Sequence, residues 1–101
     1  MDFSDYVSDH CKQYHYSAEY ERYWLAHPYC EVGVADGHVR YASAPHHIRT
    51  RGAAGDDDSE GNLLALCTDC HTAIHQMGTW TFARRHPSVK AKIRRARRVT
   101  V

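Results

Sequence analysis

The nine residues CTDCHTAIH at positions 67–75 constrain the fold of this chain more than any other stretch. Cys67 and Cys70 have the CxxC spacing at which a tight turn presents two thiolates to one tetrahedral ion. His71 and His75 are four residues apart, so both imidazoles project from one face of a helix that begins near Cys70. A chain of 101 residues has a small core, which bound metal often supplements. The segment predicts ligands for two different metal ions.

The cellular setting decides between metal binding and disulfide formation for the four cysteines. The N-terminal sequence MDFSDYVSDH has neither the basic start nor the apolar centre of a secretory signal. No apolar run reaches the roughly 20 residues that span a bilayer. We therefore expect a reducing, cytoplasmic location, in which cysteines are metal ligands or free thiols. A CxxC redox motif shares the spacing, but no thioredoxin-like context surrounds this pair.

A structural zinc site requires two more ligands besides Cys67 and Cys70. Cys30 is the natural third ligand, because it lies in a turn before a predicted hairpin. Gly33 stands where a second CxxC motif would have its second cysteine, so the fourth ligand has to come from elsewhere. His38 and Cys11 are the candidates, and we prefer His38. The alternative is that Cys30 is an ordinary buried thiol and that no zinc binds.

Local patterns predict a short helix and then a hairpin in the first half of the chain. Ser17 precedes a glutamate-containing turn, and the pattern ends before Pro28, as in a capped helix. Residues 29–48 contain the β-branched and aromatic runs EVGV and HVRYAS. The dipeptide Asp36-Gly37 between these runs suits a tight turn between antiparallel strands.

The second half of the chain reads as a loop, a helix and a basic tail. Residues 50–62 are rich in Gly, Asp and Ser, which predicts an exposed loop with a solvated acidic run at 56–58. A helix then runs to Gly78. Residues 79–86 suggest an irregular or extended aromatic segment, and a terminal helix opens near Pro87. From Arg84 onward the chain has no acid, so this tail is a candidate phosphate-contacting surface or a solvated helix face.

The adjacent pair His46-His47 completes a recognisable constellation. Neighbouring residues of a strand point to opposite sides, so one histidine can face the ion while the other stays free. PHHIRTRG at 45–52, followed by GDDDSEGNLLALCTDCHTAIH at 55–75, resembles the His-Asn-His (HNH) endonuclease family. The resemblance covers roughly residues 28–75 and continues more loosely through WTFARRHPSVKAKI at 80–93.

This resemblance implies a fold and a division of roles. The fold is α+β, a ββα-metal core of hairpin and helix, flanked by an N-terminal helix and a basic C-terminal helix. We expect one domain, 1–101, with its core at about 28–78, an N-terminal extension at 1–27 and a basic arm at 79–101. In the roles that the family implies, His46, His71 and His75 hold the catalytic ion, His47 is the general base, and Asn62 fixes the loop and orients the base.

The chemistry of these residue types is consistent with hydrolysis of a phosphodiester. A divalent ion (Mg, Mn, Ni or Zn) can polarise the phosphate and stabilise the leaving oxygen, while a free imidazole accepts a proton from water. Arg49 and Arg51 would share the strand face of His47 and contact substrate phosphate, although Arg51 can equally be an ordinary solvated arginine. Further predicted nucleic-acid contacts are Arg84, Arg85, Lys90, Lys92, Arg94 and Arg95.

The predicted function is nicking or weakly selective cutting of DNA, most simply double-stranded DNA, by a one-ion mechanism. The chain has no obvious added recognition element, so double-strand cutting would require a dimer or a partner, such as a phage packaging or host protein. The resemblance to this family also implies a bacterial or phage origin. The alternative from a different class is an inactive, zinc-stapled nucleic-acid-binding or phage assembly module.

Overall fold

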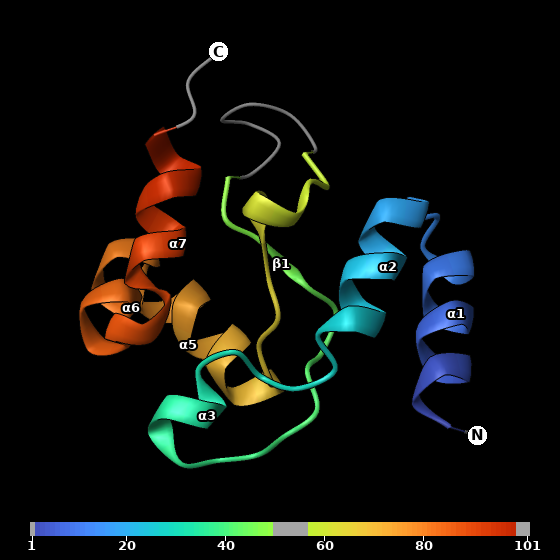
Figure 1. Ribbon diagram of the computed structural model, residues 1–101, viewed down its shortest axis with the longest axis horizontal. Coiled ribbons are helices and arrows are strands. Elements are labelled where there is room, and N and C mark those ends of the chain that lie inside the picture. Colours follow the sequence, from blue (N-terminus) through green and yellow to red (C-terminus); the bar gives the residue numbers. More distant parts are fainter. Residues whose placement is uncertain (1, 50–56, 99–101) are drawn as a thin grey trace.

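The computed structural model describes residues 2–49 and 57–98, and its first two helices lie side by side (Figure 1). These are α1 (Phe3–Gln13) and α2 (Ala18–Ala26). Ser17 caps α2, because its hydroxyl accepts a hydrogen bond from the backbone N–H of Tyr20 at 3.1 Å. The helix stops before Pro28, so the predicted capped helix is confirmed.

The hairpin predicted within residues 29–48 is wrong. Its EVGV run enters a single helical turn, α3 (Gly33–Asp36), which ends at Gly37 with φ at 82°. Antiparallel pairing of the two predicted runs with each other is limited to the segments 28–30 and 40–42, which are joined by the bridge between Tyr29 and Tyr41. The Asp36-Gly37 dipeptide does turn the chain, but it closes a helix rather than a pair of strands.

The antiparallel ribbon of the fold joins residues much further apart in the sequence. Strand β1 (His46–His47) pairs with β2 (Leu63–Leu64), with His46 opposite Leu64 and His47 opposite Leu63. The short helix η1 (Glu60–Asn62) leads directly into β2. The predicted α+β class with two antiparallel strands and a helix is confirmed, but the strands bracket the loop instead of preceding it.

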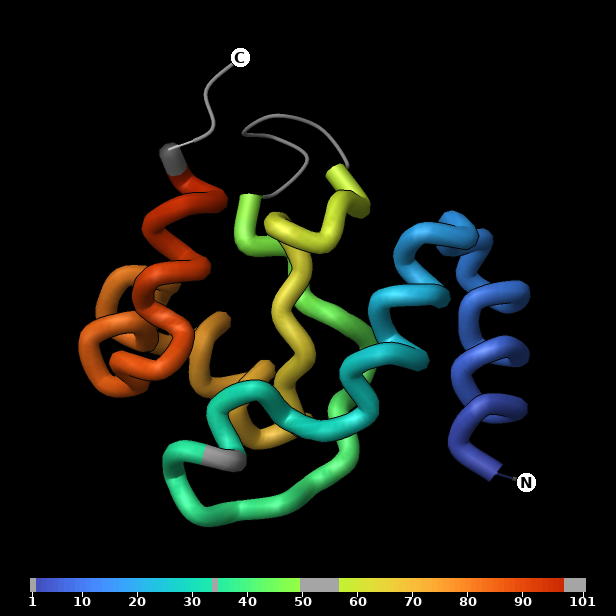
Figure 2. The backbone as a smooth tube through the Cα atoms, viewed as in Figure 1, coloured from blue at the N-terminus to red at the C-terminus, as the bar shows by residue number. Residues whose placement is uncertain are grey.

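Alternation along the extended segment 63–66 separates two hydrophobic clusters. Leu63 and Ala65 pack on one side with α1 and α2, while Leu64 and Leu66 pack on the other with the C-terminal helices. All four side chains are at most 1% exposed. The ribbon therefore lies between the two hydrophobic clusters in the middle of the molecule, where Figure 2 shows it in green and yellow.

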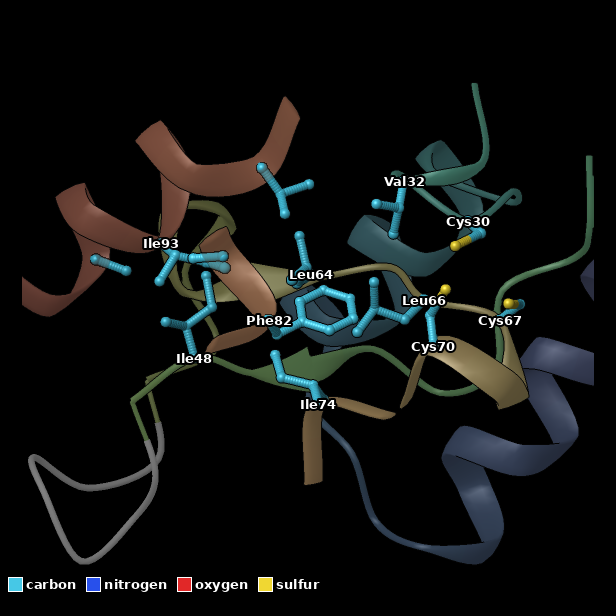
Figure 3. Packing of buried hydrophobic residues seen from close by; sticks show 13 residues of the cluster. Cys30, Val32, Ile48, Leu64, Leu66, Cys67, Cys70, Ile74, Phe82 and Ile93 are labelled. Carbon is cyan, nitrogen blue, oxygen red and sulfur yellow. The ribbon is translucent and has the colours of Figure 1, made fainter. Parts of the chain in front are cut away.

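Three helices cover the second side of this ribbon: α5 (Thr68–Met77), α6 (Thr79–Arg85) and α7 (Pro87–Arg98). Gly78, with φ at 89°, lies between α5 and α6. The expectation of an irregular or extended segment at 79–86 is wrong, because residues 79–85 are helical. Phe82 is fully buried between Leu64 and Ile74, whereas Trp80 is 43% exposed (Figure 3).

The terminal helix α7 is amphipathic and contributes to the core. Val89, Ile93 and Ala96 recur at spacings of four and three and are buried, while Arg94 and Arg95 on the opposite face are exposed. Pro87 is its first helical residue, as predicted. None of the helices within residues 2–49 and 57–98 is long and apolar enough to cross a membrane.

Candidate active site and metal centres

Strand alternation sends the two adjacent histidines to opposite sides of the ribbon. Residues paired across an antiparallel ribbon project to the same side, so His46 shares the side of Leu64 and His47 that of Leu63. His46 meets α5 on its side. His47 meets α2, where its ring stacks on Tyr20 with the centroids 5.5 Å apart. The pair is thus divided between two environments.

Three imidazoles meet on the α5 side, and we call His46, His71 and His75 the histidine cluster. One ring nitrogen of each lies within 4.8 Å of those of the others. The Nε2 atoms of His71 and His75 are 3.1 Å apart, close to the separation of about 3.4 Å expected for two imidazoles on one ion. The helical spacing of four residues produces this approach, because both side chains leave one face of α5.

The environment of the histidine cluster favours the neutral forms of His46 and His71. Burial, together with the smaller effect of the neighbouring imidazoles His71, His75 and His47, lowers the pKa of His46 to about 4. Burial and then His75 also lower the pKa of His71. Ser43 Oγ lies 3.5 Å from His71 Nδ1, which leaves Nε2 facing the cluster. Neutral imidazoles with converging nitrogens fit a divalent cation.

The histidine cluster is open to solvent on one side. It borders a pocket of about 280 Å³, which we call the histidine pocket. His75 is exposed and His46 is only partly buried. Three protein ligands with an open position are typical of catalytic metal sites, since substrate or water can complete the coordination. The pocket is lined by Tyr16, Tyr20, Ala44, Pro45, His46, His47, His71 and His75.

His47 is held by a carboxylate from the loop. Its Nε2 lies 2.7 Å from Asp58 Oδ1, and the other oxygen of Asp58 accepts a hydrogen bond from Ser17 at 2.7 Å. Tyr20 packs on the ring of His47 and donates its hydroxyl to the Pro45 carbonyl at 2.6 Å. Among the described residues nothing bonds to His47 Nδ1, so that nitrogen is the one left to exchange a proton.

The expectation of a solvated acidic run at 56–58 is therefore wrong for its last two members. Asp58 binds His47, and Asp57 forms an ion pair with Arg49 and accepts the N–H of Ser59 at 2.9 Å. Asp56 lies outside the described residues. No local pattern signals the pairing of Asp58 with His47 or of Asp57 with Arg49, because each joins residues that lie before and after positions 50–56.

Asn62 ties the two ends of the loop together. Its side chain is 1% exposed, and its Oδ1 accepts the N–H of Arg49 at 2.8 Å. Its amide donates to the carbonyls of Arg49 at 3.2 Å and Asp57 at 2.8 Å. A buried amide with all these bonds is a rigid clamp. Asn62 affects the position of His47 only indirectly, because it binds Asp57, the neighbour of Asp58.

The predicted nucleic-acid contacts differ in exposure and in whether they already pair with groups of the protein. Arg49 is 8% exposed and paired with Asp57. Lys92 donates to Tyr23 and lies 3.4 Å from the Glu31 carboxylate, so it also has partners inside the protein. Arg51 lies outside the described residues. Arg84, Arg85, Arg94 and Arg95 are exposed, and Lys90 is partly buried.

A second group of ligands, which we call the cysteine cluster, consists of Cys30, His38, Cys67 and Cys70. Their ligand atoms all lie within 4.8 Å of one another. His38 Nε2 is 3.8 Å from Cys67 Sγ and 4.0 Å from Cys70 Sγ. A tetrahedral zinc ion would hold such atoms about 3.5 to 3.8 Å apart. The cluster could therefore hold a structural zinc ion, and Figure 3 shows the three sulfur atoms converging.

The fold explains why a glycine stands at position 33. A Cβ atom there would lie 2.2 Å from the backbone oxygen of His38, so no side chain fits. The turn that Gly33 permits brings His38 to the three thiols in place of a fourth cysteine. Cys11, the other candidate, is buried in α1 among the residues of the other hydrophobic cluster.

Two of the thiols of the cysteine cluster have shifted pKa values. Burial raises the pKa of Cys67, but hydrogen bonds from Cys70 and Cys30 outweigh it and lower the pKa overall. Burial and the charge of Cys30 raise the pKa of Cys70. Crowded thiols of this kind cannot all ionise without a cation, and zinc would remove that conflict by binding the thiolates.

Comparison with known proteins gives one family. Residues 28–77 match the family model of the HNH endonuclease, a range that includes every member of both clusters together with His47 and Asn62. Neither the curated proteins nor the solved structures yield a match.

Proposed function

Since residues 28–77 belong to the HNH endonuclease family, we propose that this protein is a metal-dependent endonuclease that hydrolyses DNA phosphodiester bonds with one catalytic ion and a histidine base. The family indicates nuclease activity on nucleic acid and the use of a divalent metal. The observation that carries the finer proposal is the approach of His46, His71 and His75 to within 4.8 Å, beside a fourth imidazole turned away from them.

The histidine cluster has the composition of a catalytic ion site. The three imidazoles would hold a divalent cation, and the histidine pocket would leave room beside it for a phosphate group. A bound cation would offset charge on the scissile phosphate and stabilise the departing alkoxide. The imidazoles come from a strand and a helix that are both packed in the core, so their positions are fixed before substrate arrives.

His47 is suited to act as the base. Hydrolysis forms a bond from a water oxygen to phosphorus, breaks a bond from phosphorus to a sugar oxygen, and releases one proton from the water. We assign that proton to His47 Nδ1, because Asp58 holds Nε2. The ring cannot rotate freely, since Tyr20 packs on its face. Strand alternation keeps this base off the cation that His46 would bind.

The cysteine cluster takes a structural role in this proposal. It joins α3 to the start of α5, so a zinc ion there would hold the helix that carries His71 and His75. All four ligand positions are filled by protein, which is typical of structural zinc sites. The cluster therefore sets the position of the catalytic ligands without contacting substrate.

Charge supports contact with the DNA backbone. Arg94, Arg95 and Arg97 form an exposed basic face on α7. Backbone contacts of this kind carry no sequence information, so we propose nicking or weakly selective cutting by the monomer. Double-strand cutting would require a dimer or a partner protein. A cytoplasmic location in a bacterial host, or a phage origin, belongs to the same proposal.

Plasmid nicking tests the proposal. Supercoiled plasmid is incubated with wild type or His47→Ala in the presence of Mg²⁺, Mn²⁺ or Ni²⁺. We expect wild type to nick the plasmid with at least one ion, and His47→Ala to nick about 10²- to 10⁴-fold more slowly while still binding DNA. No cutting by wild type with any ion, combined with retained DNA binding, would favour an inactive binding module instead.

A further inference from the structure

A run of aromatic rings leads from His47 to the surface. Tyr20 stacks on His47, and Tyr16 stacks on Tyr20 with the centroids 4.1 Å apart. Beyond them lie His10, 6.0 Å from Tyr16, and Tyr14, 4.6 Å from His10. The run begins at the proposed base and ends in solvent.

The three tyrosines of this run are more exposed the further they lie from His47. Tyr20 is buried, Tyr16 is 36% exposed and Tyr14 is 55% exposed. Tyr16 lines the histidine pocket with His46 and His47, so the exposed rings are continuous with the proposed active site. Large exposed aromatic side chains cost solubility, and a group of them beside a pocket indicates a binding surface.

The backbone holds these rings in place through an unusual turn. His15, between Tyr14 and Tyr16, has φ at 58°, a conformation that residues other than glycine rarely adopt. Tyr16 N–H donates to the Cys11 carbonyl at 3.0 Å and closes the turn. The rings on either side of His15 lie 6.1 Å apart as a result.

The charge of this segment suits an anionic strand. Residues 10–16, HCKQYHY, contain Lys12 and two histidines and no acid. An aromatic ring accepts the face of a base, and a nearby cation accepts the phosphate that follows it. In a regular duplex both faces of each base are covered by neighbouring bases, so a protein ring can stack only on a base that has left the helix.

We propose that Tyr14 and Tyr16 form a stacking surface for an unpaired base next to the scissile phosphate, so that the preferred substrate is single-stranded or locally unpaired DNA. This inference rests on the proposed function, since it takes the histidine pocket as the place of the phosphate. It departs from the expectation of a double-stranded substrate that the sequence suggested. Tyr14, the outermost ring, carries the stacking contact, while Tyr16 directs the strand to the histidine pocket.

Binding measurements test the surface. Fluorescence anisotropy, without added divalent ion, compares a labelled single-stranded oligonucleotide with the blunt duplex of the same sequence. We expect wild type to bind the single strand more tightly, and Tyr14→Ala to lose about 5- to 100-fold of that affinity with little change for the duplex. Tyr14→Phe keeps the ring and should bind like wild type. Trp80→Ala, which removes another exposed ring (43% against 55% for Tyr14) from α6, is the matched control and should change neither affinity.

Two results would overturn the inference: equal or tighter binding of the duplex by wild type, or equal losses in Tyr14→Ala and Trp80→Ala. Plasmid nicking distinguishes failure of this inference from failure of the proposed function. Nicking by wild type without any single-strand preference would refute the stacking surface alone. A single-strand preference that depends on Tyr14, in a protein that cuts no DNA, would support the surface and refute the nuclease proposal.

Discussion

The two ligand clusters share the helix α5 but differ in almost every physical property. The cysteine cluster has four ligands, and its sulfur atoms belong to side chains that are at most 9% exposed. The histidine cluster has three ligands and borders an open pocket. The cysteine cluster could fill the coordination of an ion completely, while the histidine cluster would leave a position for substrate.

This contrast teaches how a small domain separates stability from chemistry. Cys70 and His71 are neighbours in the sequence, yet they face different clusters because consecutive residues of a helix point about 100° apart. The buried cluster can stabilise the start of α5 without obstructing the exposed face. Three substitutions test this separation: Cys67→Ala, His71→Ala and Asp58→Asn.

Removal of one thiol should affect stability most. We expect Cys67→Ala to lower the stability of the domain by at least about 3 kcal/mol, or about 15 °C in melting temperature, because the variant cannot close a four-ligand zinc site. Differential scanning calorimetry measures this. Cys11→Ala is the matched control, since it removes a buried cysteine outside the cluster and should cost only about 1–2 kcal/mol.

Removal of zinc with a chelator is the second part of that experiment. Wild type and Cys11→Ala should both lose stability when zinc is removed, while Cys67→Ala should not respond. The contradicting result is a wild-type melting temperature that is the same with and without a strong chelator, together with no zinc in elemental analysis. The cysteine cluster would then hold no structural ion, and it would not differ from the histidine cluster in the way proposed.

Removal of one imidazole should abolish activity and leave the fold intact. His71→Ala takes away one of three ligands of the catalytic ion, so we expect undetectable nicking and at least about tenfold weaker binding of Mn²⁺ by calorimetry. The melting temperature should change little, because His71 is only partly buried. His27→Ala, a histidine outside both clusters, should behave like wild type. Unchanged metal affinity in the His71 variant would contradict the assigned ligand set.

Asp58 should have the smallest of these effects, because it acts through His47. Asp58→Asn keeps the shape of the side chain but loses its charge, and we expect nicking to slow by about 10- to 100-fold with unchanged metal affinity. Nitrogen chemical shifts of His47 should show a change in which ring nitrogen carries the proton. Asp9→Asn, an exposed acid on α1, should leave both unchanged. Wild-type activity in Asp58→Asn would show that His47 does not depend on the Asp58 carboxylate.

Local patterns predicted several elements well. Ser17 and Pro28 marked the ends of α2 because capping and the steric effect of proline act within one turn. Gly78 marked the end of α5, and Pro87 the start of α7, for similar reasons. The spacing of His71 and His75 predicted a shared helix face, and their nitrogens do approach to 3.1 Å.

Predictions that depended on distant partners were less successful. The β-branched and aromatic runs after Tyr29 suggested strands, but residues 33–36 form a helical turn, which brings His38 to the cysteine cluster. The partner of β1 is β2, which lies beyond a long loop. Asp58 read as solvated surface, because nothing in a run of acids reveals that one of them will reach His47.

The amino-acid sequence established the kinds of ligand, their spacing on α5 and the division of His46 from His47, since each follows from backbone periodicity over a few residues. The tertiary structure selects His38 rather than Cys11 to join the three thiols, pairs Asp58 with His47, and brings the exposed Tyr16 to the histidine pocket. The contacts of Asp58 with His47 and of His38 with Cys67 and Cys70 join residues 11, 29 and 32 positions apart. They are selected by packing of the whole core, which no local pattern encodes.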